Sequence, residues 1–452
     1  MDEKEKKSGG RFSSRLDTLK NRFLPNKNSG IRRVFANFIS LSFLQGANYI
    51  IPLITLPYLT RVLGVEKFGL IMFAQAFNQY FIMLSDYGFN LSATRDISSK
   101  RDDPARVSQI FSSVITIKFL FVLLGALIML ILVLVFDRFG EEWILYFLTF
   151  GTVIGQAMLP VWFFQGIEQM KFITLLNLLA RLIFTISIFF VIDSSADYLF
   201  VPVLNSLGYF IAGIVSLYLA VNRFNIRLHW PGSHSIISRI KSGFSVFATS
   251  FLPQLYISST TFILGLLTNN ILVGYYAAAT KIVDAVTSIL YIISQAFYPS
   301  LSRDFLYHRN LKRIAMGTGL VLSSGLFIFS DYIVSLVFGP QYTQTSQLIR
   351  ILSISPLAVA MIVSYGTNCL LVFRKDMLYL KITMTVSLLG FAGAWILIML
   401  FAESGAGLNL SMSRVLLGIL AFVAVKKYIH GKEPTEERDE YISDACPTDS
   451  YI

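Results

Sequence analysis

The sequence predicts an all-α polytopic membrane protein with about twelve transmembrane helices, in two six-helix lobes around a central cavity. Three observations lead to this fold class. Hydrophobic residues make up 54% of the 452 residues and charged residues only 14%, whereas a soluble domain carries about 25% charged residues. The apolar residues gather in runs of the roughly 20 residues that cross a bilayer. The two halves of the chain also echo each other.

Twelve apolar runs, bounded by charges or by Pro/Gly turns, are the expected spans. The first six cover 34–58, 69–92, 109–136, 143–166, 172–192 and 199–221. The second six cover 243–266, 272–298, 314–337, 346–373, 378–401 and 405–425. The chain is therefore expected to divide into one lobe at 34–221, a cytoplasmic linker at 222–242 and a second lobe at 243–427.

The two ends of the chain lie outside these spans. Residues 1–33 contain ten Lys and Arg and lack the apolar core of a signal peptide. Within them, Leu16, Leu19 and Phe23 share one face of a short amphipathic helix that suits an anionic membrane surface; a solvated basic arm is an equal alternative. Residues 428–452 are rich in acidic side chains, and we expect a disordered cytoplasmic tail.

Lysine and arginine predict the orientation. Of the 38 Lys and Arg, 29 fall on the N-terminal side of the membrane, and only Arg61, Lys67 and Arg138 fall in the opposite connectors. Because positively charged loops stay in the cytoplasm, both termini are expected to be cytoplasmic. The net charge of +11 is thus a topology signal, and no nucleic-acid partner is needed to explain it.

An internal repeat relates the two halves at an offset of about 205 residues. Shifted by this amount, Gly69 meets Gly274, and Ala74 meets Ala279. Six spans separate the equivalent positions, so both halves have the same orientation. A pseudo-twofold axis along the membrane normal would then relate the lobes and leave a cavity between them.

Polar side chains concentrate in the spans at 34–58, 69–92, 243–266 and 272–298. At helical spacing they form stripes, which include Asn48 and Thr55, then Gln75, Asn78, Gln79, Asp86 and Asn90, then Ser258 and Thr261, and finally Lys281, Asp284, Ser288, Tyr291 and Gln295. Polar residues inside a membrane usually face a water-filled cavity. We expect these four spans to line one.

Six cations lie within the predicted spans. Lys118, Arg350 and Lys381 are near enough to span ends to extend toward the membrane surface. The deeper three are Arg181, Lys281 and Arg414. A lipid-facing cation at a helix centre costs roughly 2.5–3.5 kcal/mol, so these three are expected to face the interior.

Two readings of the deep cations are open. Lys281 and Asp284 are three residues apart and can form a purely structural ion pair on one helix face. The excess of cations over acids suits instead an anionic substrate, above all a diphosphate, which Lys and Arg bind by charge-assisted hydrogen bonds.

Enzymatic chemistry has no support in the sequence. It contains no Walker loop, no HExxH and no GxSxG motif, and the connectors opposite the termini are too short for a catalytic domain. Cys369 and Cys446 are the only cysteines. We expect no enzyme, no metal site and no cofactor, with coupling to H⁺ or Na⁺ as an open possibility.

Three stretches carry a resemblance to a known family. They are TRVLGVEKFG (60–69) followed by LSDYGFNLSATRDIS (84–98), PVWFFQGIEQMKFIT (160–174), and FGPQYTQTSQLIRILS (338–353). They resemble polysaccharide-exporting flippases of the Wzx type, which belong to the multidrug/oligosaccharidyl-lipid/polysaccharide superfamily. The resemblance covers about residues 34–427.

The resemblance implies a transporter of undecaprenyl-diphosphate-linked oligosaccharide repeat units in the bacterial inner membrane, working by alternating access for O-antigen, capsule or exopolysaccharide synthesis. It implies that Arg61 sits near an outer gate, where Gly64 and Gly69 allow a tight turn. Asp86 and Arg95 would form a gate pair on the cytoplasmic side.

The resulting hypothesis gives each polar residue a role. Lys281, Arg181 and Arg414 would hold diphosphate or acidic sugar, Asn48, Gln75 and Gln79 would bind sugar hydroxyls, and Asp86 and Asp284 would couple transport to protons or sodium. The partners would be the lipid-linked oligosaccharide, membrane lipids, and the polymerase and chain-length regulator of the same pathway.

Three alternatives stay open. A cation-coupled multidrug exporter on the same fold would favour an acidic cavity. A non-transporting membrane scaffold for glycan enzymes would tolerate loss of Lys281. A membrane glycosyl-polymerising enzyme would lengthen glycans without moving them.

Overall fold

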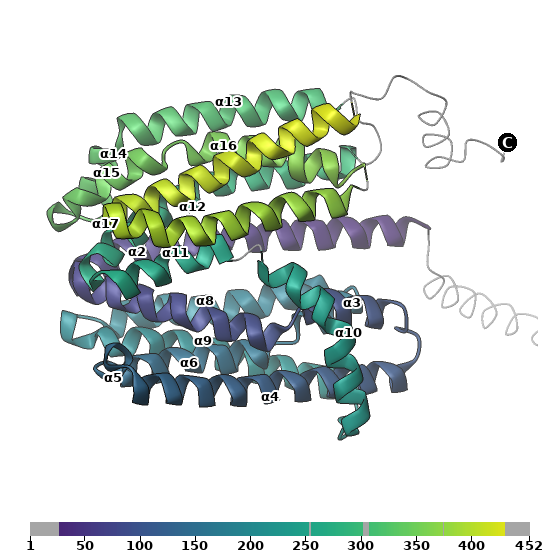
Figure 1. The fold of residues 1–452 in the computed structure, drawn as a ribbon. Helices are drawn as coiled ribbons and strands as arrows, with labels where there is room; N and C mark the ends of the chain where they lie inside the picture. Colours follow the sequence, from purple (N-terminus) through teal and green to yellow (C-terminus); the bar gives the residue numbers. More distant parts are fainter. Residues whose placement is uncertain (1–26, 253–254, 302–306, 374, 430–452) are drawn as a thin grey trace, which may run out of the picture.

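The helices of the computed structural model form two bundles that lie against each other (Figure 1). The structure describes residues 27–252, 255–301, 307–373 and 375–429, and within these ranges every regular element is a helix. The predicted class, an all-α membrane protein with two lobes, is confirmed.

The first lobe contains most of the N-terminal elements. In order they are α2 (Lys27–Asp86), α3 (Phe89–Ser98), α4 (Pro104–Val135), α5 (Asp137–Gly140), α6 (Trp143–Ala157), α7 (Val161–Gly166), α8 (Met170–Val191), the short 3₁₀ turn η1 (Ser195–Leu199), α9 (Phe200–Tyr218) and the π-helical turn η2 (Leu219–Arg223). Helix α2 holds two predicted spans, because Gly64 at φ 74° breaks it and the chain turns back. Glycine adopts this left-handed region without steric cost.

The second lobe is built in the same way. Its elements are α11 (Leu255–Leu267), α12 (Asn270–Leu301), α13 (Tyr307–Ile328), α14 (Ser330–Val337), η4 (Pro340–Tyr342), α15 (Thr343–Leu352), α16 (Ser355–Met361), the π-helical η5 (Ile362–Leu370) and α17 (Asp376–Ile429). Helix α17 also contains two predicted spans, separated by a break at Ala402. In the described part, each predicted apolar run therefore coincides with helix.

Helix α10 (Ser233–Phe251) connects the lobes and begins inside the segment predicted as linker. It crosses the end of the first lobe and packs on α3 and α4 (Figure 1). The ring of Tyr87 stacks on Phe247 at 4.8 Å, and its hydroxyl donates to the carbonyl of Ile240. The structure thus places the first half of the seventh predicted span on the first lobe.

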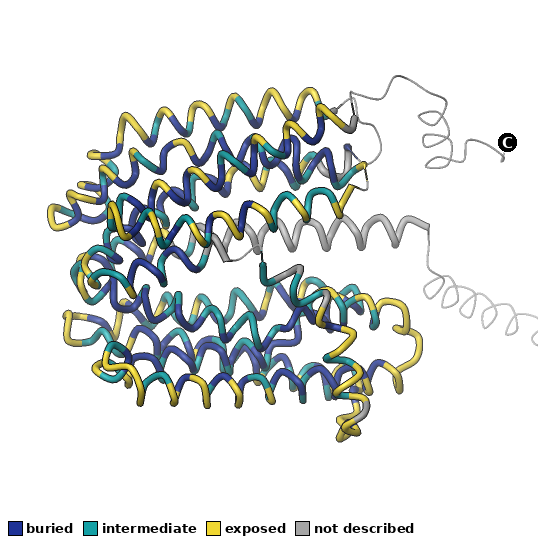
Figure 2. The backbone as a smooth tube through the Cα atoms, viewed as in Figure 1, coloured by how far each residue is buried: buried dark blue, intermediate teal, exposed yellow. Residues whose placement is uncertain are grey.

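The outward surfaces of the bundles are apolar. Among the described residues, nine helical stretches are long and apolar enough to cross a membrane. Exposed residues alternate with buried ones along these helices (Figure 2). Many of the exposed residues are large hydrophobics, such as Leu134 and Phe190. Surfaces of this kind are stable in lipid and not in water, and the chain is a multi-pass membrane protein.

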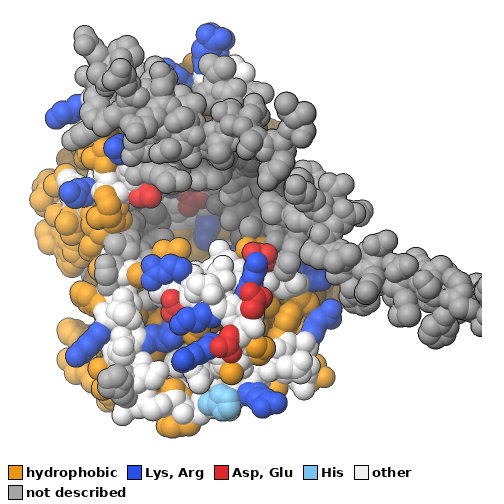
Figure 3. Space-filling model, turned by 90° about the vertical axis from the view of Figure 1, so that its right-hand side faces the viewer, with side chains coloured by type: hydrophobic (Ala, Val, Ile, Leu, Met, Phe, Trp, Pro, Cys, Tyr) orange, Lys and Arg blue, Asp and Glu red, His pale blue; other side chains and the backbone are white. Residues whose placement is uncertain are grey.

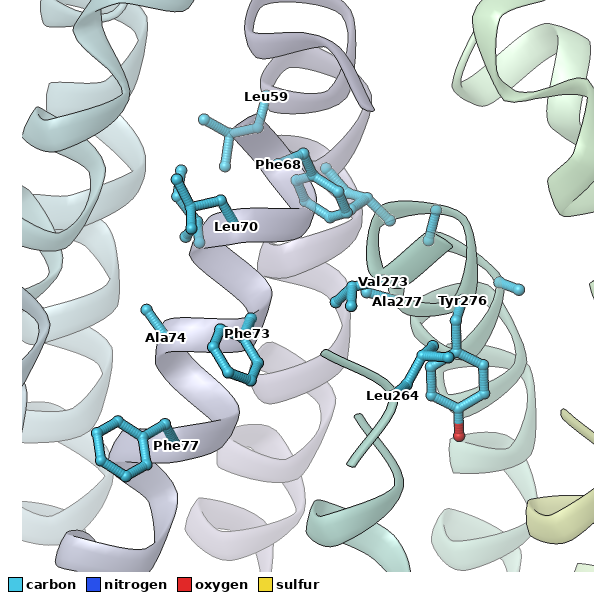
Figure 4. Packing of buried hydrophobic residues seen from close by; sticks show 14 of the residues in the cluster. Leu59, Phe68, Leu70, Phe73, Ala74, Phe77, Leu264, Val273, Tyr276 and Ala277 are labelled. Atoms are coloured by element: carbon cyan, nitrogen blue, oxygen red, sulfur yellow. The ribbon is translucent and has the colours of Figure 1, made fainter. Parts of the chain in front are cut away.

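One hydrophobic core joins the lobes at the end where Gly64 turns the chain. It combines Phe73 and Phe77 of α2 with Leu264 of α11 and Val273 of α12, and Figure 4 shows it between these helices. The rings of Phe73 and Phe77 stack on Phe262 at 5.6 and 5.5 Å. The lobes are therefore held together here by apolar packing.

The closest approach of the lobes lies at Gly69 and Gly274. A Cβ on Gly69 would lie 1.8 Å from the carbonyl oxygen of Asn270, and a Cβ on Gly274 would lie 2.3 Å from that of Val65. Positions 65 and 270 have the same sequence separation as positions 69 and 274. The two contacts therefore join equivalent residues of the repeat, with their roles exchanged. Such reciprocal contact is what a twofold axis produces, and it supports the predicted repeat. Gly69 therefore allows two helices to pack closely. The tight turn, which was expected to involve both glycines, is made at Gly64.

The lobes part at the opposite end. Figure 3 shows a hollow between them on the face where α2 begins and α17 ends. We call this face the open end, and the end at Gly64 the closed end.

Candidate functional site: two adjoining cavities

A cavity of about 290 Å³ lies beside α2, between the first lobe and α12. We call it the cationic cavity. Its walls come from both arms of α2 and from α6, α8, α9 and α12, and its polar lining consists of Thr55, Gln75, Asn78, Gln79, Thr149, Thr152, Gln156, Arg181, Asn205, Tyr209 and Lys281. Among the described lining residues, Arg181 and Lys281 alone are charged.

Lys281 faces this cavity from the second lobe. Its side chain is exposed and borders the cavity, although α12 lies in the middle of the molecule. Within the described residues, its ammonium has no ion pair. The predicted Lys281–Asp284 pair is not formed, because Asp284 accepts a hydrogen bond at 2.7 Å from Arg414 of α17.

Arg414 and Asp284 are thus brought together outside the cationic cavity. Arg414 is buried, with its side chain 11% exposed, and neither residue lines the cavity. The three cations predicted to act together are therefore separated by the structure into two groups, Arg181 with Lys281 in one cavity and Arg414 in an ion pair.

A second cavity of about 320 Å³ adjoins the first on the side of the open end. We call it the N-lobe cavity. It is lined by Gln79, Ile82, Met83, Ser85, Asp86, Gly88, Asn90, Lys118, Gln156, Leu159, Val161, Asn177, Tyr209, Phe247 and Phe251. Gln79, Ile82, Gln156 and Tyr209 line both cavities, so the two spaces share a wall.

An ion pair lies in the N-lobe cavity. The ammonium of Lys118 is 3.4 Å from the carboxylate of Asp86, which also accepts a hydrogen bond at 2.9 Å from Asn90. The side chain of Lys118 was expected to extend toward the membrane surface, but it is only 4% exposed. Its charge can be buried because the carboxylate of Asp86, on α2, compensates it.

The predicted gate pair of Asp86 and Arg95 is not formed either. Asp86 pairs with Lys118, and Arg95 is exposed on α3 without an ion pair to any described residue. The neighbouring Asp96 instead pairs with Arg239 of α10 at 3.0 Å. Of the two neighbouring residues, Asp96 and not Arg95 therefore forms an ion pair between α10 and the first lobe.

Helices α6 and α9 supply cavity residues that the sequence analysis did not select. Thr149, Thr152 and Gln156 follow one another at spacings of three and four residues on α6, and Asn205 and Tyr209 are four apart on α9. This helical spacing is the signal that identifies one face. The expected walls, spans 1, 2, 7 and 8, are only partly found, since α11 packs against α17. Asn48 lies in α2, but its side chain is outside the described part.

Polar contacts close the end at Gly64. Arg61 donates to the carbonyl of Leu336, and Gln341 donates to that of Thr60 at 3.3 Å. Arg138 donates to the side chain of Asn270 at 2.9 Å and to a carbonyl of α11 at 3.0 Å. All these bonds connect one lobe to the other. Arg61 thus takes part in the contacts between the lobes at the closed end.

The fold, with two helical lobes, is shared with solved structures of membrane transporters. A solved structure of the lipid II flippase MurJ, in an inward closed conformation, matches with a TM-score of 0.64 and 15% identity, and covers 87% of each chain. An inward-facing multidrug resistance MATE transporter matches with a TM-score of 0.60 and 15% identity, over 84% of this chain and 95% of that one. At this identity the likeness shows the fold.

Sequence comparison then gives the family. Residues 34–305 match the model of the family described as polysaccharide biosynthesis protein. A protein of Escherichia coli (strain K12) named "Putative O-antigen transporter" is 30% identical over 398 residues, which cover 86% of this chain and 96% of that protein. The chain belongs to the polysaccharide biosynthesis protein family, as the resemblance predicted. The E. coli relative is named as a transporter and the MurJ structure as a flippase, in agreement with the prediction that the chain is not an enzyme.

Proposed function

We propose that this protein is a flippase that moves undecaprenyl-diphosphate-linked oligosaccharide repeat units across the bacterial inner membrane for surface polysaccharide synthesis. The observation that carries the proposal is the cationic cavity, whose charged described lining residues are Arg181 and Lys281. The name of the E. coli relative supports a glycan substrate. The flippase of lipid II on the same fold supports a substrate attached to a lipid.

A diphosphate is the anion that suits this cavity. Lys281 supplies a mobile ammonium, and Arg181 a planar guanidinium that binds two oxygens at once. A hydrogen bond to a charged group contributes about 1.5–3 kcal/mol. The amides of Gln75 and Gln79 lie in the same lining and would bind sugar hydroxyls. Two cations without an acid among the described lining residues also disfavour the cationic substrates of a multidrug exporter.

Alternating access is the mechanism that the two ends support. The lobes are packed and hydrogen-bonded at the closed end, and they part at the open end. With both termini in the cytoplasm, the hollow faces the leaflet in which the repeat unit is assembled. Export then requires the closed end to open while the open end closes, with the lipid tail left in the bilayer.

Ion coupling would use the two paired carboxylates. Asp86 pairs with Lys118, and Asp284 pairs with Arg414. A proton or a sodium ion that neutralises either carboxylate removes the attraction to its cationic partner, and this changes the relative stability of the two states. The polymerase and the chain-length regulator of the same pathway are the proposed protein partners.

Reconstitution tests the function. The protein is placed in liposomes with a fluorescent undecaprenyl-diphosphate oligosaccharide, and a membrane-impermeant quencher reports movement between leaflets, with and without a pH or sodium gradient. Lys281→Ala should lower the transport rate at least tenfold, since one charged hydrogen bond is lost. Lys281→Arg should keep most of it.

Matched controls separate the outcomes. Lys241→Ala removes an exposed lysine of α10 and should leave transport unchanged. If Lys281→Ala moves the lipid at the wild-type rate, the flippase function is supported and the binding role of Lys281 is rejected. No movement of the correct glycan lipid rejects the flippase in favour of a scaffold, and export of cationic dyes instead would identify a multidrug exporter.

A further inference from the structure

The two adjoining cavities differ in charge. The cationic cavity carries Arg181 and Lys281 without an acid among its described lining residues. In the N-lobe cavity the charges of Asp86 and Lys118 compensate each other at 3.4 Å. An anionic group is therefore stabilised in the first cavity, whereas the second suits a group that is polar and uncharged.

The shared wall presents hydrogen-bonding groups that have no partner among the described residues. The side chains of Gln79, Gln156 and Tyr209 form no hydrogen bond with any described residue, and they line both cavities. All three side chains are half-buried, so their polar groups remain accessible from the cavities. They are thus available to bind water or a ligand rich in hydroxyls and amides.

Aromatic rings complete the N-lobe cavity. Phe247 and Phe251 of α10 lie in its lining with Tyr209 of α9. A sugar has hydroxyls at its edge and C–H groups on its faces, so it needs both hydrogen-bonding groups and flat apolar surfaces. Tyrosine offers the two together. A lipid tail, in contrast, would leave the amides without polar partners and would place the Asp86–Lys118 pair against an apolar chain.

The two cavities lie at different depths between the closed end and the open end. Lys281 is eleven residues from the closed-end start of α12 at Asn270, or about 16 Å at 1.5 Å per residue. Asp86 is 22 residues from Gly64, or about 33 Å along its helix. The N-lobe cavity is therefore nearer to the open end than the cationic cavity.

We propose that the N-lobe cavity is a glycan subsite, in which Gln156 and Tyr209 hold sugar of the substrate while Lys281 and Arg181 hold its diphosphate. This inference rests on the proposed function. It adds residues of α6 and α9 that set specificity for the glycan and leaves the diphosphate contacts unchanged.

Binding of two lipids to the detergent-purified full chain tests the subsite. The probes are undecaprenyl diphosphate and the same lipid carrying the repeat unit, isolated from producing cells, and the Kd of each is measured by thermophoresis. Tyr209→Phe and Gln156→Leu should each weaken binding of the glycosylated lipid about 2- to 12-fold, the effect of one neutral hydrogen bond. Neither should change binding of the bare lipid. Tyr218→Phe is the matched control, since Tyr218 lies on the same helix with 65% of its surface exposed.

The outcomes distinguish the two proposals. Lys281→Ala should weaken both lipids equally, because both contain the diphosphate. Equal losses for both lipids in Tyr209→Phe or Gln156→Leu would overturn the glycan subsite and keep the flippase. Equal wild-type Kd values for the two lipids would also overturn the subsite. Wild-type protein that binds neither lipid would overturn both proposals.

Discussion

Replacing Gly69 with alanine should push the lobes apart at the closed end. The new Cβ would lie 1.8 Å from the carbonyl oxygen of Asn270 and 2.7 Å from the backbone nitrogen of Gly274. Both are backbone atoms, so no side-chain rotation relieves the clash. Overpacking of this kind costs about 1–3 kcal/mol.

In the proposed alternating-access cycle, this cost falls on one of the two states. If the clash exists only where the lobes touch, Gly69→Ala raises the free energy of the state closed at this end and leaves the other state unchanged. A difference of about 1–3 kcal/mol shifts the ratio of the two states about 5- to 150-fold. Gly274→Ala should act in the same direction, and the double variant should show less than the sum, since one separation relieves both contacts.

Cysteine accessibility measures the shift. Leu63, in the closed end, is 3% exposed and lines the cationic cavity. A Leu63→Cys reporter, in a background with Cys369→Ala and Cys446→Ser, is labelled with an impermeant maleimide added to spheroplasts. Its labelling rate should rise in Gly69→Ala by the factor given above.

Gly317→Ala is the control for this experiment. A Cβ at Gly317 of α13 meets nothing within 4 Å, so labelling should not change. If Gly69→Ala folds and labels at the same rate as Gly317→Ala, then contact at Gly69 does not keep this end closed, and the reasoning is refuted.

Two further predictions use the polar contacts. Asp86→Asn should destabilise the protein more than Lys118→Met, because the first leaves an ammonium that is 4% exposed without its counter-charge, at about 3–5 kcal/mol. The second leaves a carboxylate that is 30% exposed and still bonded to Asn90, at about 1–3 kcal/mol; thermal unfolding in detergent measures both, and the reverse order would contradict the argument. Arg61→Ala removes one exposed bond to Leu336 across the lobes, worth about 1 kcal/mol or less. The labelling rate of the closed-end reporter should therefore rise less than about fivefold, and an effect larger than that of Gly69→Ala would show that polar contacts, and not backbone packing, hold this end.

The arrangement of the helices follows from features that are local in sequence. Apolar runs of bilayer length predict helices whatever their neighbours, and the offset of the repeat correctly relates Gly69 to Gly274, which meet across the lobes. The turn at Gly64 is likewise set by one residue.

The pairing of charges could not be predicted in the same way. Lys281 and Asp284 share a helix, but Asp284 bonds to Arg414, 130 residues away. Which cation meets which acid depends on how each helix is rotated in the bundle, and the sequence of a single helix does not contain this. The polar face of α6 was equally hard to recognise, because threonine in an apolar helix often bonds to its own backbone, as Thr149 does to the carbonyl of Leu145.

Because α10 packs on the first lobe, the short segment between α10 and α11 limits how far the two lobes can move apart. Helix α10 ends at Phe251 and α11 of the second lobe begins at Leu255, so four backbone steps join the lobes, which reach at most about 14 Å when fully extended. A separation of the lobes beyond this reach has to pull α10 off α3, and this breaks the ion pair of Arg239 with Asp96. The number of residues between α10 and α11 thus limits how wide the open end can become while α10 stays docked, and with it the size of the lipid head group that the proposed function would admit.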